Sequence, residues 1–287
     1  MIIVRIWEGL GNQMFQYAFA RAMQAKGMTV RLDMEKAYDE TFDKFRNHMR
    51  RTTGIQNFNL HINAIDMYEY GKYSYLKRDT FIRKMMYFMG KNSFWPYKFY
   101  EEAEQKYAPR AEKLKGNYYV KGWFQSERYF KGIRSILLKE FTPKKKIEIT
   151  GEIREALNDL QSVSVHIRRG DYVKINNTVS VLYYQRAIQY IKTLYPNPVF
   201  LIFSDDLEWV KGNLKFEGKR VYVNEDKKMQ DYEELLVMSK CKSNIIANST
   251  FSWWAAWLNQ NEEKCVIAPE KWFPGQEGIV PEEWVCI

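Results

Sequence analysis

The chain has 287 residues, long enough for one large domain or for two domains that each bury a core of their own. With 46% hydrophobic and 16% aromatic residues it is globular, and its net charge of +9 suits an anionic partner or a basic solvent face. The three cysteines form no CxxC pair and there are only three histidines, which argues against a disulfide framework or a zinc centre and favours a reducing compartment.

The amino terminus and the apolar runs bear on targeting. MIIVRIWEGLGNQ reaches a charge at Arg5 and lacks a signal-peptide core, and no apolar run approaches the roughly 18 residues of a membrane-spanning helix. We therefore expect a cytoplasmic protein that is soluble, or at most peripheral on the inner face of the membrane.

The first half of the chain opens with a strand–helix–strand pattern. Residues 2–7 predict a buried strand, EGLGNQ a tight turn, residues 13–26 an apolar-striped helix and MTVRLD a second strand. Such a βαβ unit implies a parallel sheet covered by helices. Residues 35–115, dense in aromatic and basic side chains, predict helices with long connections, and NYYVKGWFQSERYF predicts a strand leading into a helix.

The second half repeats the α/β alternation more regularly, which predicts a second, doubly wound sheet. FTPKKKIEITG (141–151) is interpreted as the linker between an N-terminal α/β domain at 1–143 and a C-terminal α/β domain at 150–287. The expected strands lie near 162–168, 198–204, 219–223, 244–247 and 264–267, and the expected helices near 180–195, 206–212, 229–240 and 250–259.

The strand end VHIRRGDYV carries the first candidate site, because open α/β sheets bind ligands outside the carboxyl ends of their strands. Alternation places His166 and Arg168 on one face and Arg169 on the other. An arginine at this position can bind phosphate through two parallel hydrogen bonds. Asp171 could fix an arginine, cap a turn or act as a base, and a salt-bridged surface arginine pair is the alternative for the whole segment.

Two further strand ends open helices. In FLIFSDDLEWV, Asp205 and Asp206 favour helix capping or hydrogen bonds to a nucleoside over the alternative of a metal-binding acid pair. In IIANSTFSWWAAWL, a helix N-terminus is typical of phosphate binding, and its tryptophans indicate core packing. Glu234, on the preceding helix, is ordinarily a solvent-facing acid. The residues that open this second helix are Ser249, Thr250, Phe251 and Ser252.

The amino-terminal GLGNQMFQYAFARA is a fourth candidate. Its two glycines allow close approach of a ligand to a turn. As a dinucleotide fingerprint the segment is poor, because Asn12 and Gln13 are polar amides where such a fingerprint needs small residues.

Four segments, in order, resemble the bacterial α-1,2-fucosyltransferases, which share a superfamily with the α-1,6- and protein O-fucosyltransferases. They are GLGNQMFQYAFARA, VHIRRGDYV, FSDD and MSKCKSNIIANSTFSWWAAWL, and the match runs from Ile3 to Leu258. The resemblance implies a GT-B architecture of two Rossmann-like domains facing a cleft. It further implies GDP-β-L-fucose as the donor substrate, a galactose-terminated glycan as the acceptor, inversion at the anomeric centre, and no metal ion or other cofactor.

The resemblance also implies roles for single residues. Arg168 would grip the diphosphate and stabilise the charge of the leaving group, with Arg169 supporting the loop. His166 would line the donor pocket, and the STFS segment would cradle the phosphates. Glu234 falls where relatives carry an aspartate that binds guanine. Asn12 matches an amide that sits beside the donor sugar.

The catalytic base is open at this point. Glu8 departs from the glycine that relatives usually carry just before GLGNQ, and its position would place it near the acceptor. Asp171 lies so close to Arg168 in sequence that an ion pair would make it a poor base. Glu8 as the base and a dissociative mechanism without a dedicated base are equal alternatives.

Two other functions compete with a fucosyltransferase. The charge of +9 and the many aromatic residues suit a nucleic-acid-binding protein, although the basic residues are scattered and no binding motif occurs. An inactive module that binds a nucleotide sugar is the third possibility. We expect no nucleic-acid partner.

Overall fold

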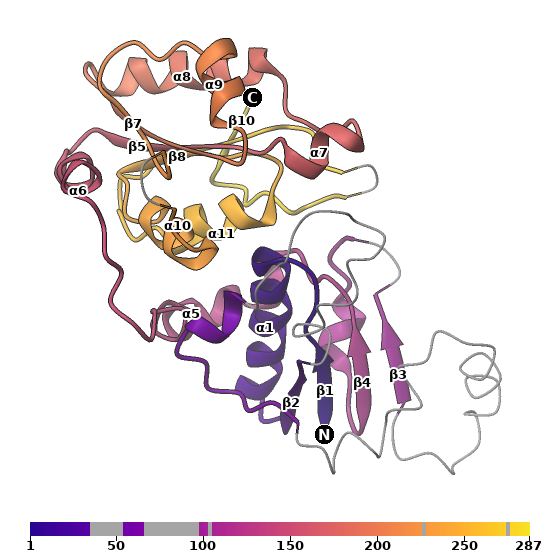
Figure 1. Cartoon of the computed structure of the whole chain (residues 1–287). Helices are drawn as coiled ribbons and strands as arrows, with labels where there is room; N and C mark the ends of the chain where they lie inside the picture. Colours follow the sequence, from indigo (N-terminus) through magenta and orange to yellow (C-terminus); the bar gives the residue numbers. More distant parts are fainter. Residues whose placement is uncertain (35–53, 66–97, 103–104, 226–227, 274–275) are drawn as a thin grey trace. The chain divides into compact units, whose positions relative to one another are not determined.

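A computed structural model describes residues 1–34, 54–65, 98–102, 105–225, 228–273 and 276–287 (Figure 1). The chain forms two compact units. Unit 1 comprises Met1–Thr142 and Gly275–Ile279, and unit 2 comprises Pro143–Pro274 and Val280–Ile287. The division falls within the lysine-rich segment 141–151, but residues 275–279 group with unit 1 and not with the C-terminal half of the chain. Most of the helices expected within 35–115 lie outside the described residues.

Unit 1 contains a four-stranded sheet in which every described pairing is parallel. The strands expected at 2–7, in MTVRLD and after Asn117 are confirmed. A further strand in KFYE was missed, because four residues of mixed polarity give no readable period. The strands are β1 (Ile2–Arg5), β2 (Val30–Asp33), β3 (Lys98–Glu101) and β4 (Tyr118–Lys121), in the order β2-β1-β4-β3.

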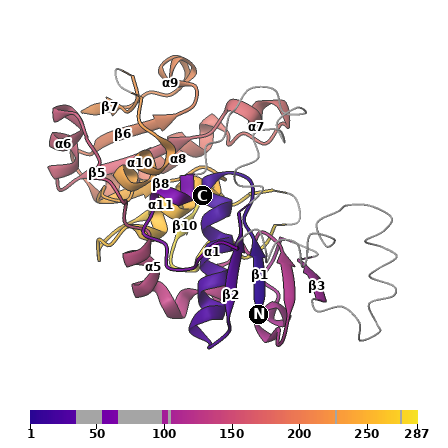
Figure 2. The same ribbon diagram turned by 60° about the horizontal axis from the view of Figure 1, so that its bottom comes forward.

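Helix α1 (Leu10–Ala25) lies along the sheet of unit 1, beside β1 and β2 (Figures 1 and 2). It begins three residues before the expected start at 13, because Gly9 already occupies the N-cap position. Most of its residues are buried, including the amides of Gln13 and Gln16. The remaining described helices of unit 1 are η2 (Gly54–Asn57), η4 (Pro109–Lys113), η5 (Glu127–Tyr129), η6 (Lys131–Ile133) and α5 (Arg134–Glu140).

Unit 2 contains a six-stranded parallel sheet in the order β10-β9-β8-β5-β6-β7. Counted from β5, this is the order 3-2-1-4-5-6 read from the other edge, which is the order of a dinucleotide-binding Rossmann sheet. The topological switch point therefore lies between β5 and β8. The strands are β5 (Ser162–Ile167), β6 (Val199–Ser204), β7 (Arg220–Tyr222), β8 (Ser243–Ile245), β9 (Val266–Ala268) and β10 (Val285–Cys286).

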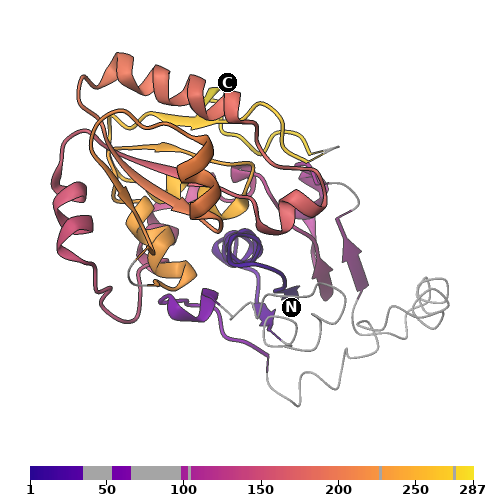
Figure 3. The same cartoon turned by 45° about the horizontal axis from the view of Figure 1, so that its top comes forward.

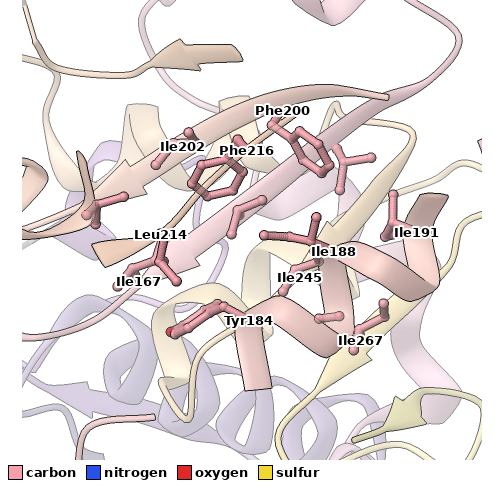
Figure 4. Close-up of a cluster of buried hydrophobic side chains, with 14 of the residues drawn as sticks. Ile167, Tyr184, Ile188, Ile191, Phe200, Ile202, Leu214, Phe216, Ile245 and Ile267 are labelled. Carbon is pink, nitrogen blue, oxygen red and sulfur yellow. The ribbon is translucent and has the colours of Figure 1, made fainter. Parts of the chain in front are cut away.

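Helices cover both faces of this sheet, with α8 and α9 on one side and α10 and α11 on the other (Figures 1 and 3). Figure 4 shows Tyr184, Ile188 and Ile191 of α8 gathered with Ile245 and Ile267 of the sheet in one buried apolar cluster. The helices of unit 2 are α6 (Gly151–Asn158), α7 (Gly170–Lys174), α8 (Val181–Leu194), α9 (Leu207–Asn213), α10 (Asp231–Met238) and α11 (Thr250–Leu258).

The expected alternation of strands and helices in unit 2 is confirmed from β5 to β9. Three short elements, α6, α7 and β10, were missed, because stretches of two to eight residues with mixed polarity carry too little periodicity. Across the described ranges, no helix is both long enough and apolar enough to cross a membrane.

The packing at the end of β4 predicts that Gly122→Ala destabilises the protein. A Cβ atom at Gly122 would lie 2.7 Å from Cζ of Phe124 and 2.8 Å from Cβ of Glu102. Overpacking of this kind costs about 1–3 kcal/mol, which urea denaturation measures as a lower free energy of unfolding. The matched control is Gly132→Ala, where an added Cβ meets nothing within 4 Å. Equal stability of the two variants would contradict the prediction.

Candidate functional site

The switch point of unit 2 brings two candidate segments together. Strands β5 and β8 pair directly, with Val163 opposite Ser243 and Val165 opposite Ile245. Parallel strands end at the same edge of a sheet. The segment that follows β5 therefore lies next to the N-terminus of α11, which follows β8, at the topological switch point. The segments VHIRRGDYV and IIANSTFSWW are therefore neighbours, as the strand-end rule predicted.

Arg168 is the central cation of this edge. Its side chain is 20% exposed, and its Nη1 lies 2.7 Å from Oδ2 of Asp205 while its Nη2 lies 2.7 Å from Oδ1 of Asp171. Burial opposes the charged form, but the two carboxylates outweigh burial and raise the pKa of Arg168 above its usual value. The ion pair expected between Asp171 and an arginine is thus present. A guanidinium has five N–H groups, which is more than these two ion pairs use.

The Ser-Asp-Asp segment after β6 supports the same loop. Asp206 is the N-cap of α9 and accepts a hydrogen bond from the backbone N–H of Trp209, which confirms the expected capping. The Arg169 side chain donates to Asp206 at 3.0 Å and lies 3.6 Å from the centroid of the Trp209 ring. The backbone N–H of Arg169 donates to Asp205 at 2.8 Å. Among the described residues, no group of three or more His, Cys, Asp or Glu side chains could hold a metal ion.

His166 lies on the opposite face of β5 from the cluster in Figure 4, as the alternation predicted. Its side chain packs at 5.4 Å from the Phe251 ring, measured between centroids. Burial, reinforced by the nearby charge of Arg168, lowers the pKa of His166 to about 3, so the imidazole is neutral. Its Nδ1 and the Oδ1 of Asn248 are buried without a hydrogen-bond partner within the part of the chain that the structure describes.

A buried polar atom that finds no partner costs about 1–3 kcal/mol, so a ligand or water that bonds to these two atoms would be stabilised there. His166 and Asn248 stand on either side of the switch point, one at the end of β5 and the other between β8 and α11. The pair therefore offers a ligand at this edge two polar atoms that are still available.

The N-terminus of α11 is the third part of the edge. Ser249 is its N-cap residue, and the Ser249 side chain makes no capping hydrogen bond, so the first N–H groups of the helix can bind a ligand. Ser252, in contrast, is fully buried and donates to the backbone oxygens of Ser249 and Ala247. Its hydroxyl therefore stabilises the turn from inside. The expected core role of the tryptophans is confirmed, because Trp253 and Trp254 are fully buried.

Glu234 lies on α10, where its carboxylate accepts a hydrogen bond from the Asn224 amide. Burial is the main cause that raises the pKa of Glu234 to about 7. Asn224 has a left-handed backbone with a φ of 70°, and its Oδ1 accepts from the N–H of Met229. Asn224 was missed in the sequence, although it follows strand β7 closely and the strand-end rule would have found it.

The carboxyl edge of unit 1 holds a second polar constellation. Glu8 accepts a hydrogen bond from Asn12 at 2.9 Å, Asn12 accepts one from Gln125 at 2.7 Å, and Gln125 accepts one from Gln276. The two glycines of GLG, Gly9 and Gly11, were expected to bracket this turn, and the structure places Gly9 at the N-cap of α1 and Gly11 within the helix. Glu8 itself carries the left-handed backbone, with a φ of 65°, while Gly9 has a φ of −72°.

Glycine is the residue that adopts a φ near 65° without strain, so Glu8 holds a backbone conformation that most side chains avoid. In this chain the buried Gln13 amide donates to the backbone oxygen of Glu8 at 2.6 Å and holds the turn. Gln125 was missed, because only the long-range contact with Asn12 separates it from an ordinary loop residue.

Comparison with known proteins identifies the family. The model described as "Glycosyl transferase family 11" matches residues 1–287. The chain is 32% identical over 308 residues to an alpha-1,2-colitosyltransferase of Escherichia coli, covering 100% of this chain and 99% of the relative. It is 30% identical over 306 residues to the O-antigen biosynthesis glycosyltransferase WbnK of Escherichia coli, covering 96% and 97%.

One solved structure, a mutant of Arabidopsis thaliana FUT1 in complex with GDP, is 11% identical and gives a TM-score of 0.49 over 93% of this chain and 70% of that chain. The match of the family model to every residue and the two full-length relatives lead to one conclusion: this chain belongs to glycosyl transferase family 11.

Proposed function

We propose that the protein transfers L-fucose from GDP-β-L-fucose to a hydroxyl group, O2, of a terminal galactose in a glycan, with inversion at the anomeric carbon. It is an enzyme of the α-1,2-fucosyltransferase type, as a member of family 11 with relatives of that activity. In this proposal the two units face a cleft, as in GT-B enzymes, with the donor on unit 2 and the acceptor on unit 1.

The donor assignment rests on the permanently charged Arg168 at the end of β5, together with helix α11, which opens after the neighbouring strand β8. A diphosphate gains negative charge as the bond to the sugar breaks, and a fixed cation with free N–H groups stabilises that charge most where it develops. Asp205 and Asp171 hold the guanidinium in place, so it needs no reorganisation. Arg168 and the α11 N–H groups would do the work that a divalent cation does in other transferases, so we expect no metal requirement.

Glu234 is proposed as the residue that reads guanine. Its mostly buried carboxylate can accept from the two neighbouring N–H groups of the base. Asn224 already donates to one of its oxygens and so fixes the rotamer. A neutral His166 and Asn248 would complete the donor contacts through the buried atoms that have no partner among the described residues.

Glu8 is proposed as the general base. One of its oxygens is held by Asn12, and the other makes no hydrogen bond within the described residues, so it can take the proton of the acceptor hydroxyl. Asp171 is committed to Arg168 at 2.7 Å and would lose that ion pair on protonation. Glu8 is therefore the better placed acid.

A second donor, GDP-colitose, is favoured by one observation, the full-length similarity to an alpha-1,2-colitosyltransferase. Colitose lacks one ring hydroxyl that fucose carries. A site built to hydrogen-bond that hydroxyl rejects the deoxy sugar strongly, whereas an apolar site accepts both.

The deciding experiment measures turnover of both donors with a panel of β-galactosyl oligosaccharides, in the presence of excess EDTA. We expect GDP release coupled to an α-1,2-linked product, at a higher kcat/KM for GDP-fucose. Higher kcat/KM for GDP-colitose would transfer the proposal to that donor. Complete loss on chelation, restored by manganese, would refute the metal-free part. GDP binding without any turnover would point to the inactive module.

Replacement of Arg168 should abolish most of the activity. Both Arg168→Ala and Arg168→Lys are expected to lower kcat by about 10²–10³-fold, since lysine cannot reproduce a two-bond contact with the diphosphate. Steady-state kinetics measures this, with the exposed Arg186→Lys as the control. An Arg168→Ala variant that keeps more than about a tenth of wild-type turnover would refute the role, since far larger losses are typical.

Replacement of Glu8 tests the base. Glu8→Gln should lower kcat by about 10²–10⁴-fold and remove the fall in rate at low pH. Glu8→Gly should lose as much activity yet unfold at the same or a higher temperature, because glycine relieves the left-handed backbone. The comparison variant, Asp171→Asn, should keep the acidic limb of the profile. Near-normal turnover of Glu8→Gln would leave a mechanism without a dedicated base.

A further inference from the structure

The loop Trp123–Gln125, which follows β4, has an unusual backbone. Phe124 has a φ of 53°, in the left-handed region that bulky residues rarely adopt. Its ring stacks on Phe19 of α1 with centroids 4.0 Å apart and planes 7° apart. This conformation buries Phe124 and leaves the next residue, Gln125, within reach of Asn12. Something outside the loop must therefore hold the strained backbone.

Glu102 is the residue that holds it. Glu102 is 4% exposed, and its Oε2 accepts hydrogen bonds from the backbone N–H groups of Trp123 at 2.7 Å and Phe124 at 3.0 Å. Tyr129 approaches the other oxygen at 3.5 Å. Within the described ranges Glu102 forms no ion pair, and burial raises its pKa to about 7. A buried acid without a cation is costly to ionise, which sets it apart from the surface acids of this chain.

The chain of amides that begins at Gln125 has one consistent orientation. The Glu8 carboxylate can only accept, so Asn12 must present its NH₂ group to Glu8 and its oxygen to Gln125. Gln125 must then present its NH₂ group to Asn12 and its oxygen to Gln276. Each donor points toward Glu8, so the bonds polarise one another in one direction. A movement of the loop that displaced Gln125 would disrupt this whole series of hydrogen-bonded amides.

We propose that Glu102 is a positioning residue for the transfer reaction: its carboxylate fixes the loop Trp123–Gln125, the loop aims Gln125 at Asn12, and Asn12 fixes Glu8. The inference rests on the proposed role of Glu8. Glu102 touches no reacting atom in this scheme, and it acts through four hydrogen bonds.

The titration of Glu102 gives the scheme a pH dependence. A carboxylate accepts N–H groups more strongly than a neutral acid does, so the loop loosens as the pH falls through about 7. The ionisable groups that face Glu102 are the hydroxyls of Tyr100 and Tyr129, with Arg110 beyond the Tyr100 ring. The pKa of each tyrosine is raised above its usual value, and arginine stays charged. Among the groups that face it, Glu102 alone changes charge near neutral pH.

Stability responds in the opposite direction from activity. The pKa of Glu102 in the folded state lies above the 4.5 of an ordinary glutamate. Its contribution to the free energy of unfolding is therefore full below pH 4.5 and is lost as the pH rises through about 7. At pH 8 the wild type bears the full cost of a buried charge, which a glutamine at position 102 does not bear. A purely structural role predicts that Glu102→Gln lowers the thermal midpoint at pH 8, whereas a positioning role predicts lower kcat without a lower thermal midpoint.

The test is Glu102→Gln, with the neighbouring exposed acid variant Glu101→Gln as the matched control. At pH 8 we expect kcat to fall about 10- to 100-fold with little change in KM, because small misplacement of a catalytic group has this effect. The thermal midpoint of Glu102→Gln at pH 8 should equal or exceed that of the wild type. The step in kcat near pH 7 should vanish in Glu102→Gln.

A second readout does not depend on activity. Amide hydrogen exchange of Trp123 and Phe124, corrected for intrinsic rates, should accelerate in Glu102→Gln and in the wild type between pH 8 and pH 6. Glu101→Gln should match the wild type. Unchanged exchange would show that Glu102 does not hold the loop and would overturn the inference.

The double variant separates this inference from the proposed base. If Glu102 acts through Glu8, then Glu8→Gln with Glu102→Gln should be no slower than Glu8→Gln alone. Additive losses would overturn the link. Normal turnover of Glu8→Gln alone would remove the proposed base, whereas wild-type turnover of Glu102→Gln would overturn the positioning role while leaving the donor assignment intact. A lower thermal midpoint of Glu102→Gln at pH 8 would reduce Glu102 to a structural residue.

Discussion

The ion pairs of Arg168 with Asp205 and Asp171 are the interaction on which the carboxyl edge of unit 2 depends. Asp205 follows β6, whereas Arg168 follows β5, so one guanidinium joins the ends of two neighbouring strands. Asp205 also accepts the backbone N–H of Arg169, and Asp206 pairs with the Arg169 side chain. The positive charge at the switch point is therefore fixed in direction as well as in protonation state. An exposed arginine would keep its charge but not a fixed direction, since exposed ion pairs are weak and mobile.

The two units organise their strand ends by different physical means. Unit 2 uses full charges, and the neutral His166 lies beside them without adding a cation. Unit 1 uses amides and two left-handed residues, Glu8 and Phe124, that the surrounding hydrogen bonds must hold. A charged edge suits a diphosphate, and an edge of oriented amides suits the hydroxyls of a sugar. The proposed placement of the donor on unit 2 and of the acceptor on unit 1 rests on this contrast.

Much of unit 2 could be predicted from the sequence. Its strands are apolar runs with buried faces, and a parallel sheet between two helix layers makes such runs continuous and easy to delimit. The rule that ligands bind at the strand ends then led to His166, Arg168 and Asp205 without any coordinates. Unit 1 was harder. The left-handed backbone of Glu8 and the contact between Asn12 and Gln125, 113 positions apart, are set by tertiary structure, and no local pattern encodes them.

Glu102 marks the limit of such reasoning, because nothing in KFYEE distinguishes the acid that is buried from the neighbour that is exposed. The period of a four-residue strand is too short to assign faces, and the two N–H groups that Glu102 accepts come from another strand's loop. Buried polar groups of this kind are recognised only once their partners are known.

The assignment of Gly275–Ile279 to unit 1 has a consequence for biosynthesis. The ribosome delivers these residues after nearly all of unit 2, so unit 1 can begin to fold early but cannot be completed until residues 275–279 have emerged. Gln276, which donates to Gln125 in the series of amides that leads to Glu8, is among these residues that are synthesised late. Completion of unit 1 therefore depends on the synthesis of unit 2. A nascent protein truncated within unit 2 would lack Gln276 at the carboxyl edge of unit 1.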